Sequence, residues 1–184
     1  MLLAAAAAAC GGGSEEASVS TATPPPAVTV GPVPTVDAAT PLTEYRSADP
    51  GYSIGYPEGW NVQTPGGVFS VFTWSTDGRP IAQLTLLCDR ETKTVDGLII
   101  KDRQIIAGAG GSVPSEPTDI EVAGQPGKEI TYEVTFGALT AEQVAAYVLS
   151  GDCGWRIGLE TYGSNTREPY LPLFDRILAS FRPS

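Results

Sequence analysis

The sequence predicts an α+β domain, an antiparallel β-sheet flanked by helices, that follows a disordered N-terminal tether. Short strand-like runs succeed one another with turn residues between them, which is typical of sequential hairpins. Two other segments, near residues 95–106 and 170–181, have the three-and-four spacing of amphipathic helices. The first 43 residues show neither pattern. A chain of 184 residues therefore has room for one folded domain and a tail.

The chain begins with a short apolar segment that ends in a cysteine. Leu2, Leu3 and six alanines precede Cys10, and a Gly-Gly-Gly-Ser sequence follows it. This arrangement resembles the end of a bacterial lipoprotein signal peptide, with residues 1–9 as the signal remnant. The resemblance implies that the signal is removed and that lipid on Cys10 anchors the chain to the extracytoplasmic side of the cell membrane. A disordered Ala/Gly tail with an incidental cysteine is the alternative.

Residues 10–43 are predicted to be a disordered, lipid-anchored linker. The segment is rich in Pro, Ser, Thr and Ala and contains no aromatic residue. Such a composition cannot bury enough apolar surface to offset the entropy lost on ordering. Its prolines favour extended backbone of about 3 Å per residue, so the segment can hold a domain some distance from a membrane. The folded domain is expected over residues 44–184.

The strands of this domain are expected in chain order. Asp49-Pro50-Gly51 predicts a turn between two short strands, and Pro57-Glu58-Gly59 predicts a second turn. Residues 119–129 predict a strand followed by a hairpin turn, and alternating or apolar runs predict other strands over 68–74, 81–88, 129–136 and 155–160. In the last of these, Trp155, Ile157 and Leu159 alternate with Arg156, Gly158 and Glu160.

One segment, 140–149, fits two structures. Thr140 and Gln143 could form a helix capping box. A strand is favoured instead, because a turn at 151–154 would pair this segment with residues 155–162 as a hairpin.

The two helices have apolar stripes. Val95, Leu98, Ile99, Ile105 and Ile106 can form the stripe of the first helix, and the glycines at 108–111 are expected to end it. In the second helix, 170–181, apolar residues recur at spacings of three and four, and a proline lies in the first turn.

Three stretches resemble the PsbP-like family of bacterial lipoproteins and photosystem accessory proteins. They are YSIGYPEGW at 52–60, GQPGKEITYEV at 124–134 and FDRILASFRP at 174–183. The resemblance extends over about residues 44–183. It implies an α/β/α sandwich like that of photosystem II PsbP and Ran-binding proteins, with an antiparallel sheet between helical layers. It does not imply photosynthesis.

Composition excludes several classes of function. The formal charge is −10 with a pI of about 4.3, so binding to nucleic acid is not expected. There is no histidine and no Asp-x-Asp calcium loop, and Ser70, Ser150 and Ser180 lack a Gly-x-Ser-x-Gly context. We therefore expect no catalytic residue, no cofactor and no metal site. The carboxylates Asp49, Glu58, Asp89, Glu91 and Asp152 are interpreted as a solvated acidic surface.

Two groups of residues remain as candidates for special roles. Tyr52, Tyr56 and Trp60 are the candidate binding surface, although such aromatics more often fill a core. Cys88 and Cys153 are predicted to form a disulfide, because both project from apolar strand faces of a chain expected to be exported. Two buried free thiols are the alternative.

The sequence thus favours a monomeric, lipid-anchored binding or accessory module that lacks catalytic activity and contacts an unknown protein partner near the membrane. A lipoprotein that binds a small ligand or cation is the alternative. A hydrolase that uses two facing carboxylates is the third hypothesis.

Overall fold

The computed structural model describes residues 37–184, except 66–68, 138 and 164–165. Cys10, the signal remnant at 1–9 and most of the predicted linker lie outside the described residues. Within them, no helix is both long enough and apolar enough to span a bilayer. The first strand begins at Leu42, two residues before the expected start of the domain.

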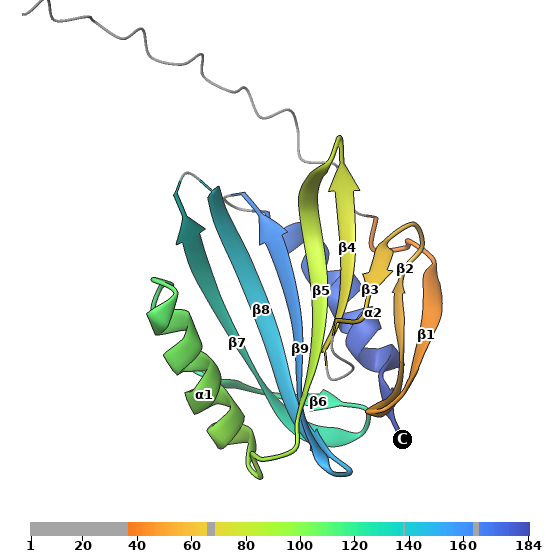
Figure 1. The fold of residues 1–184 in the computed structure, drawn as a ribbon, viewed down its shortest axis with the longest axis vertical. Helices are drawn as coiled ribbons and strands as arrows, with labels where there is room; N and C mark the ends of the chain where they lie inside the picture. Colours follow the sequence, from red (N-terminus) through yellow and green to blue (C-terminus); the bar gives the residue numbers. More distant parts are fainter. Residues whose placement is uncertain (1–36, 66–68, 138, 164–165) are drawn as a thin grey trace, which may run out of the picture. The chain divides into compact units, whose positions relative to one another are not determined.

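A seven-stranded sheet in which neighbouring strands run antiparallel forms the centre of the domain (Figure 1). Its strand order is β3-β4-β5-β9-β8-β7-β6. The strands are β3 (Asn61–Gln63), β4 (Phe69–Thr76), β5 (Arg79–Asp89), β6 (Thr118–Val122), β7 (Gln125–Phe136), β8 (Leu139–Ser150) and β9 (Cys153–Tyr162). The prediction of a strand rather than a helix over 140–149 is confirmed, because β8 pairs with β9 along its length.

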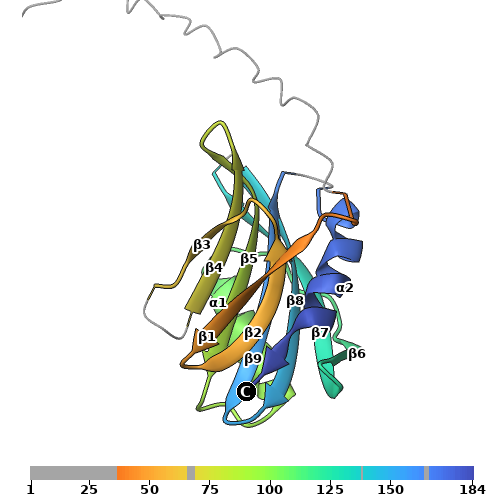
Figure 2. The same cartoon turned by 90° about the vertical axis from the view of Figure 1, so that its right-hand side faces the viewer.

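The two faces of this sheet are covered differently (Figures 1 and 2). Helix α1 (Val95–Gly108) lies on one face. The other face is covered by helix α2 (Leu171–Ser180), which follows a 3₁₀ turn (Glu168–Tyr170), and by a small sheet of order β1-β2-β10. The small sheet consists of β1 (Leu42–Ala48), β2 (Gly51–Pro57) and β10 (Arg182–Pro183). The α+β sandwich expected from the sequence is confirmed.

The larger core lies on the α2 side of the sheet. Alternate residues of β5 and β9 point into it, including Leu84, Leu86, Trp155 and Ile157, and each is at most 2% exposed. Phe181, which follows α2, packs edge-on against Trp155 with ring centroids 5.2 Å apart. This core holds α2 and the small sheet in place.

The smaller core lies between α1 and strands β7 and β8. Leu98, Ile99 and Ile106 of the helix are buried there, as expected. The expectation for Ile105 was wrong, because its side chain is 63% exposed. Steps of three and four residues from Leu98 and Ile99 lead to Asp102 and Ile106, so a carboxylate takes the place on the buried face that was assigned to Ile105.

The chain beyond α1 protects an edge of the sheet. β6 pairs only with the first part of β7, up to Glu129, so the later part of β7 is paired with β8 on one side and has no strand on the other side. Ser115 fills this gap at Thr131 by donating its N–H to the carbonyl and accepting the N–H at its Oγ, at 2.8 and 2.9 Å. Ser112 does the same at Glu133, at 2.7 and 2.9 Å. The two serines thus satisfy the exposed backbone groups of these two residues.

Candidate functional site: a half-covered pocket beside α1

The pairing of strands places polar residues in one row across the α1 face of the sheet. Gln83 of β5 lies opposite Glu160 of β9, Glu160 lies opposite Gln143 of β8, and Gln143 lies opposite Tyr132 of β7. Residues that lie opposite each other on paired strands project to the same face of the sheet. Glu160 alternates with Trp155 and Ile157, which point to the α2 side, so all four residues of the row project toward the α1 side. A polar row therefore crosses four strands.

The next row on the same face has small residues at its centre. Its central positions are Gly158 of β9 and Ala145 of β8. A Cβ atom at Gly158 would lie 2.5 Å from Nη1 of Arg156 and 3.0 Å from Oγ1 of Thr85, so no larger residue fits there without movement. The small residues leave a hollow, and the guanidinium of Arg156 lies in it.

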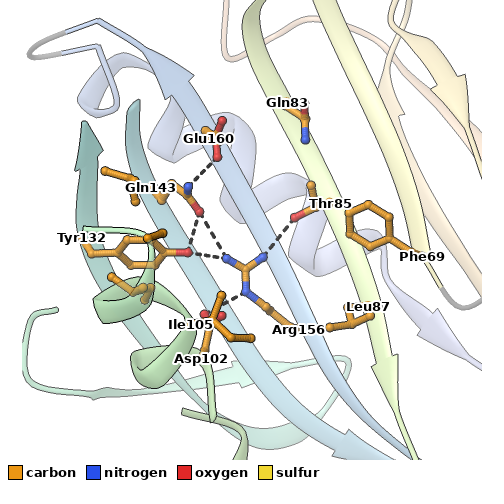
Figure 3. A pocket seen from close by; sticks show the side chains of 13 residues that line it. Phe69, Gln83, Thr85, Leu87, Asp102, Ile105, Tyr132, Gln143, Arg156 and Glu160 are labelled. Carbon is orange, nitrogen blue, oxygen red and sulfur yellow. Dashed lines mark hydrogen bonds and ion pairs between the residues drawn. The ribbon is translucent and has the colours of Figure 1, made fainter. Parts of the chain in front are cut away.

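Helix α1 covers only part of this face. It contacts β7, β8 and β9 and meets β5 at its end, where Lys101 pairs with Asp89, whereas β4 lies beyond its edge (Figure 1). A cavity of about 330 Å³ opens between the helix and β5. Its polar lining is the row described above with Thr85, Asp102 and Arg156, and its apolar lining includes Phe69, Leu87, Ile105 and Val134 (Figure 3). We call this cavity the sheet-face pocket.

Arg156 is the hub of the hydrogen bonds on the floor of the pocket (Figure 3). Its Nε donates to Oδ2 of Asp102 at 2.9 Å, and its Nη1 donates to Oγ1 of Thr85 at 3.1 Å. Its Nη2 donates to the hydroxyl of Tyr132 and to Oε1 of Gln143. The side chains of Arg156 and Asp102 are 15% and 11% exposed. Each of the three guanidinium nitrogens thus donates a hydrogen bond to a protein acceptor.

Asp102 is held from two sides. Arg156 donates to it from the sheet, and the hydroxyl of Tyr147 donates to the same carboxylate oxygen. Burial raises the pKa of Tyr147, which keeps this hydroxyl protonated and able to donate. Burial disfavours the charged form of Arg156, but the electrostatic effects of Tyr132 and Asp102 outweigh it and raise the pKa of Arg156. Arg156 therefore stays charged, and it forms an ion pair with Asp102.

Glu160 occupies the centre of the polar row. Nε2 of Gln143 donates to Oε2 of Glu160, and the hydroxyl of Tyr162 also hydrogen-bonds to this carboxylate. Among the described residues, no lysine or arginine forms an ion pair with Glu160. Glu160 is thus the charge of the pocket that lacks a contacting countercharge.

Tyr132 and Arg156 on the pocket floor are held by fixed hydrogen bonds. Burial raises the pKa of Tyr132 to about 12, so its hydroxyl is neutral at physiological pH. Arg156 is held by its acceptors and cannot turn toward a reacting group. Within the described part of the chain, no three His, Cys, Asp or Glu residues lie close enough to hold a metal ion.

The predicted aromatic surface takes a different place. Tyr52 and Trp60 are 3% and 7% exposed, and Tyr56 is half-buried with its ring 4.8 Å from that of Phe72. The hydroxyl of Tyr52 donates to Oγ of Ser70 at 2.6 Å inside the core. Tyr52 and Tyr56 therefore anchor the small sheet to the larger core, to which Trp60 also belongs, and the expectation of an exposed aromatic surface is corrected.

The structure joins Cys88 and Cys153 in a disulfide, with Cα atoms 5.3 Å apart. Cys88 ends the buried face of β5, and Cys153 begins β9 directly after the turn from β8. Both side chains belong to the larger core. The bridge fastens the end of β5 to the β8–β9 hairpin.

The acidic residues expected at the surface are mostly there. Asp49 and Asp152 are exposed and both form ion pairs with Arg90. Asp89 differs, because its side chain is only 11% exposed and accepts from Lys101 at 2.8 Å. Desolvation opposes the ionised form of Asp89, but hydrogen bonds from Lys101 and from the Thr92 and Glu91 amides lower its pKa.

Sequence reasoning did not assign a role to the residues of the sheet-face pocket. Arg156 and Glu160 were placed on the polar face of their strand, which is correct, but the polar face was interpreted as solvated. A signal did exist. Gly158 interrupts the polar alternation between them, and a glycine inside a strand marks a close approach of another group.

Comparisons with known proteins identify the fold. No family of sequences matches the chain, and neither does any curated protein. The Ran-binding protein Mog1p of Saccharomyces cerevisiae superposes with a TM-score of 0.62 at 8% identity, over 79% of this chain and 96% of that one. Cyanobacterial PsbP (CyanoP) from Synechocystis gives 0.56 at 19% identity, over 84% and 100%. PA94, a Pseudomonas aeruginosa protein of unknown function, gives 0.52 at 13% identity, over 78% and 97%. This chain has the PsbP-like α+β fold.

Proposed function

We propose that this chain is a lipid-anchored, extracytoplasmic binding module without catalytic activity, and that it contacts a protein partner near the membrane through the sheet-face pocket. The observation that carries the proposal is the incomplete cover of the sheet. A helix lies over β7 to β9 and meets β5 only at its end, which leaves a cavity of about 330 Å³ with polar and apolar walls.

Two further points support a binding role. The polar groups of the pocket floor are fixed by one another, so the surface is pre-organised and loses little entropy when a partner docks. The yeast protein of this fold is a Ran-binding protein, so the fold is able to present a protein-binding surface. A tether of the expected length would hold such a surface at high effective concentration near the membrane.

Helix α1 offers a matched pair of positions for a test of the surface. Ile105 lines the pocket and is 63% exposed, whereas Ile100 is 58% exposed on the same helix and does not line it. A photo-crosslinking amino acid at position 105 of the anchored chain should give one discrete adduct in intact cells, and the same amino acid at position 100 should give none. Equal labelling from both positions, or none from either, would contradict the proposed surface.

The anchor needs a separate test. A Cys10→Ala variant should leave the detergent phase and remain unprocessed or be released, whereas the unaltered chain should partition with detergent and lack residues 1–9. Recovery of the unaltered chain in the aqueous phase with Met1 intact would contradict lipid anchoring while leaving the pocket proposal standing.

A small ligand is the second candidate occupant. The volume of the pocket falls in the lower part of the range for small-molecule sites, about 300 to 1,000 Å³. A molecule that remains bound through native purification, and that is lost from an Ile105→Asp variant but not from Ile100→Asp, would favour this candidate over a protein partner.

A further inference from the structure

The charges that line the sheet-face pocket do not cancel. Asp102 and Glu160 are acidic and Arg156 is basic, so the lining carries one net negative charge. The charge of Arg156 is compensated by Asp102, whose Oδ2 lies 2.9 Å from Nε of Arg156. The surplus therefore lies at Glu160, on the polar row, and the chain as a whole adds to it with a formal charge of −10. A cation is the complementary occupant.

The free hydrogen-bonding capacity of the row is also that of an acceptor. The carboxylate of Glu160 accepts from Nε2 of Gln143 and from the hydroxyl of Tyr162, which leaves part of its acceptor capacity free because its two oxygens have about four lone-pair sites. Oε1 of Gln83 accepts only a long hydrogen bond from Tyr162, at 3.4 Å. An incoming group that donates several hydrogen bonds can thus be shared between Glu160 and Gln83.

The rest of the pocket suits an unbranched aliphatic stem. Phe69 and Leu87 lie opposite each other on β4 and β5 and form one wall. Ile105 of α1 forms another, with its side chain directed to the pocket (Figure 3). A stem that passes between these walls buries methylene groups and brings its polar end to the row.

These features select lysine over arginine. A guanidinium binds a carboxylate best through two parallel hydrogen bonds, one to each oxygen. Gln143 already occupies one side of Oε2 of Glu160, so this paired geometry is obstructed. A lysine ammonium is a compact charge with three donors that can be directed separately to Glu160 and Gln83.

We infer that the sheet-face pocket receives the side chain of a lysine from the protein partner, with its ammonium on Glu160 and its stem between Phe69, Leu87 and Ile105. The inference rests on the proposed function, because it names what the partner inserts. It assigns Glu160 as the group that selects the partner's residue.

The inference can be tested with the purified full-length chain by ¹H–¹⁵N NMR. The probe is Nα-acetyl-lysine N-methylamide, and the signals to follow are the side-chain amides of Gln83 and Gln143. Saturable shifts of both are expected. The Nε-acetylated probe, which lacks the charge, should give none. Glu160→Gln should weaken association about tenfold, because it removes the charge from a hydrogen-bonded pair and keeps the size of the side chain.

A variant on the opposite face provides the control. Glu133 is exposed and lies on the other side of the sheet from Tyr132, so Glu133→Gln removes the same charge without touching the pocket. It should leave association unchanged, and an equal loss in both variants would reduce the effect to net charge and overturn the inference. Absence of saturable shifts would also overturn the inference. So would binding of n-butylammonium without binding of the lysine probe, because that result would point to a free amine as the ligand.

The inference and the proposed function fail separately. A discrete crosslink at position 105 without lysine binding rejects the lysine and keeps the partner surface. Lysine binding without a crosslink rejects both, because the inference requires a partner that delivers the side chain.

Discussion

Replacement of Asp102 by asparagine tests whether the buried ion pair supports the fold. The carboxylate accepts from Arg156 and from Tyr147, and the side chains of Asp102 and Arg156 are 11% and 15% exposed. Asp102→Asn keeps the shape but leaves the guanidinium charged in a buried place. Removal of one partner from a buried pair costs about 3 to 5 kcal/mol, and we expect the lower end because the asparagine carbonyl still accepts one hydrogen bond. For a domain of this size about 3 kcal/mol lowers the melting temperature by roughly 10 °C.

The assay is urea unfolding followed by far-UV circular dichroism, with the disulfide intact. The midpoint should fall while the slope of free energy against urea stays the same, since the folded state keeps its extent. Asp96→Asn is the control, because Asp96 lies on the same helix and forms an ion pair with Lys128. The Asp96 side chain is 70% exposed, so this ion pair contributes little to stability. The control variant should lower the stability by less than about 1 kcal/mol, because an acidic residue in the first helical turn and an exposed ion pair each contribute little.

A double variant tests the cause. In Asp102→Leu with Arg156→Met, both charges are absent and the volume is filled by apolar groups, so most of the lost stability should return. If Asp102→Asn costs less than about 1 kcal/mol, or if the double variant is no more stable than the single one, the view that an uncompensated guanidinium causes the loss is refuted.

Three further changes have definite expected outcomes. Replacement of both Cys88 and Cys153 by alanine opens a loop of 65 residues and should cost about 4 kcal/mol in the chain-entropy description, measured by the same urea unfolding. Gly158→Ala places a methyl group against the Arg156 guanidinium and should cost about 1 to 3 kcal/mol, with shifted NMR signals of the pocket as a second readout. Burial, and then the charge of Asp175, raise the pKa of Glu129, so the folded state binds this proton more tightly than the unfolded state and stability falls as pH rises through that range. Glu129→Gln should therefore be more stable than the unaltered chain at pH 7, and this advantage should shrink below about pH 4.

The fold could be predicted because it depends on patterns that are local in sequence. The strict alternation around Trp155, Ile157 and Leu159 defines a strand with one buried face, and the same parity places both cysteines in one core. The prediction of a strand for β8 rested on its hairpin partner β9, which is close in sequence because only the short turn at 151–154 separates the two. These patterns can be recognised in the sequence without knowing how the sheets and helices are layered.

The pocket could not be predicted in the same way, because it depends on where a helix stops in space. The polarity of Arg156 is visible in the sequence, but its burial follows from α1 lying over it and from Gly158 leaving room. Asp102 falls within an apolar stripe, and its carboxylate becomes intelligible only when Arg156 and Tyr147 are seen to reach it from the sheet. Half of a face is covered and half is open, and no periodicity encodes that division.

The serines that close the edge of β7 bear on whether another copy of the chain can pair with it. An unsatisfied strand edge is a template on which another copy of the chain can add. Ser112 and Ser115 each offer a donor and an acceptor in the register of a strand, so the edge is terminated by the chain's own loop. The termination of this edge thus depends in part on two hydroxyl groups, and replacement of either serine by alanine would leave one backbone N–H of β7 without its acceptor.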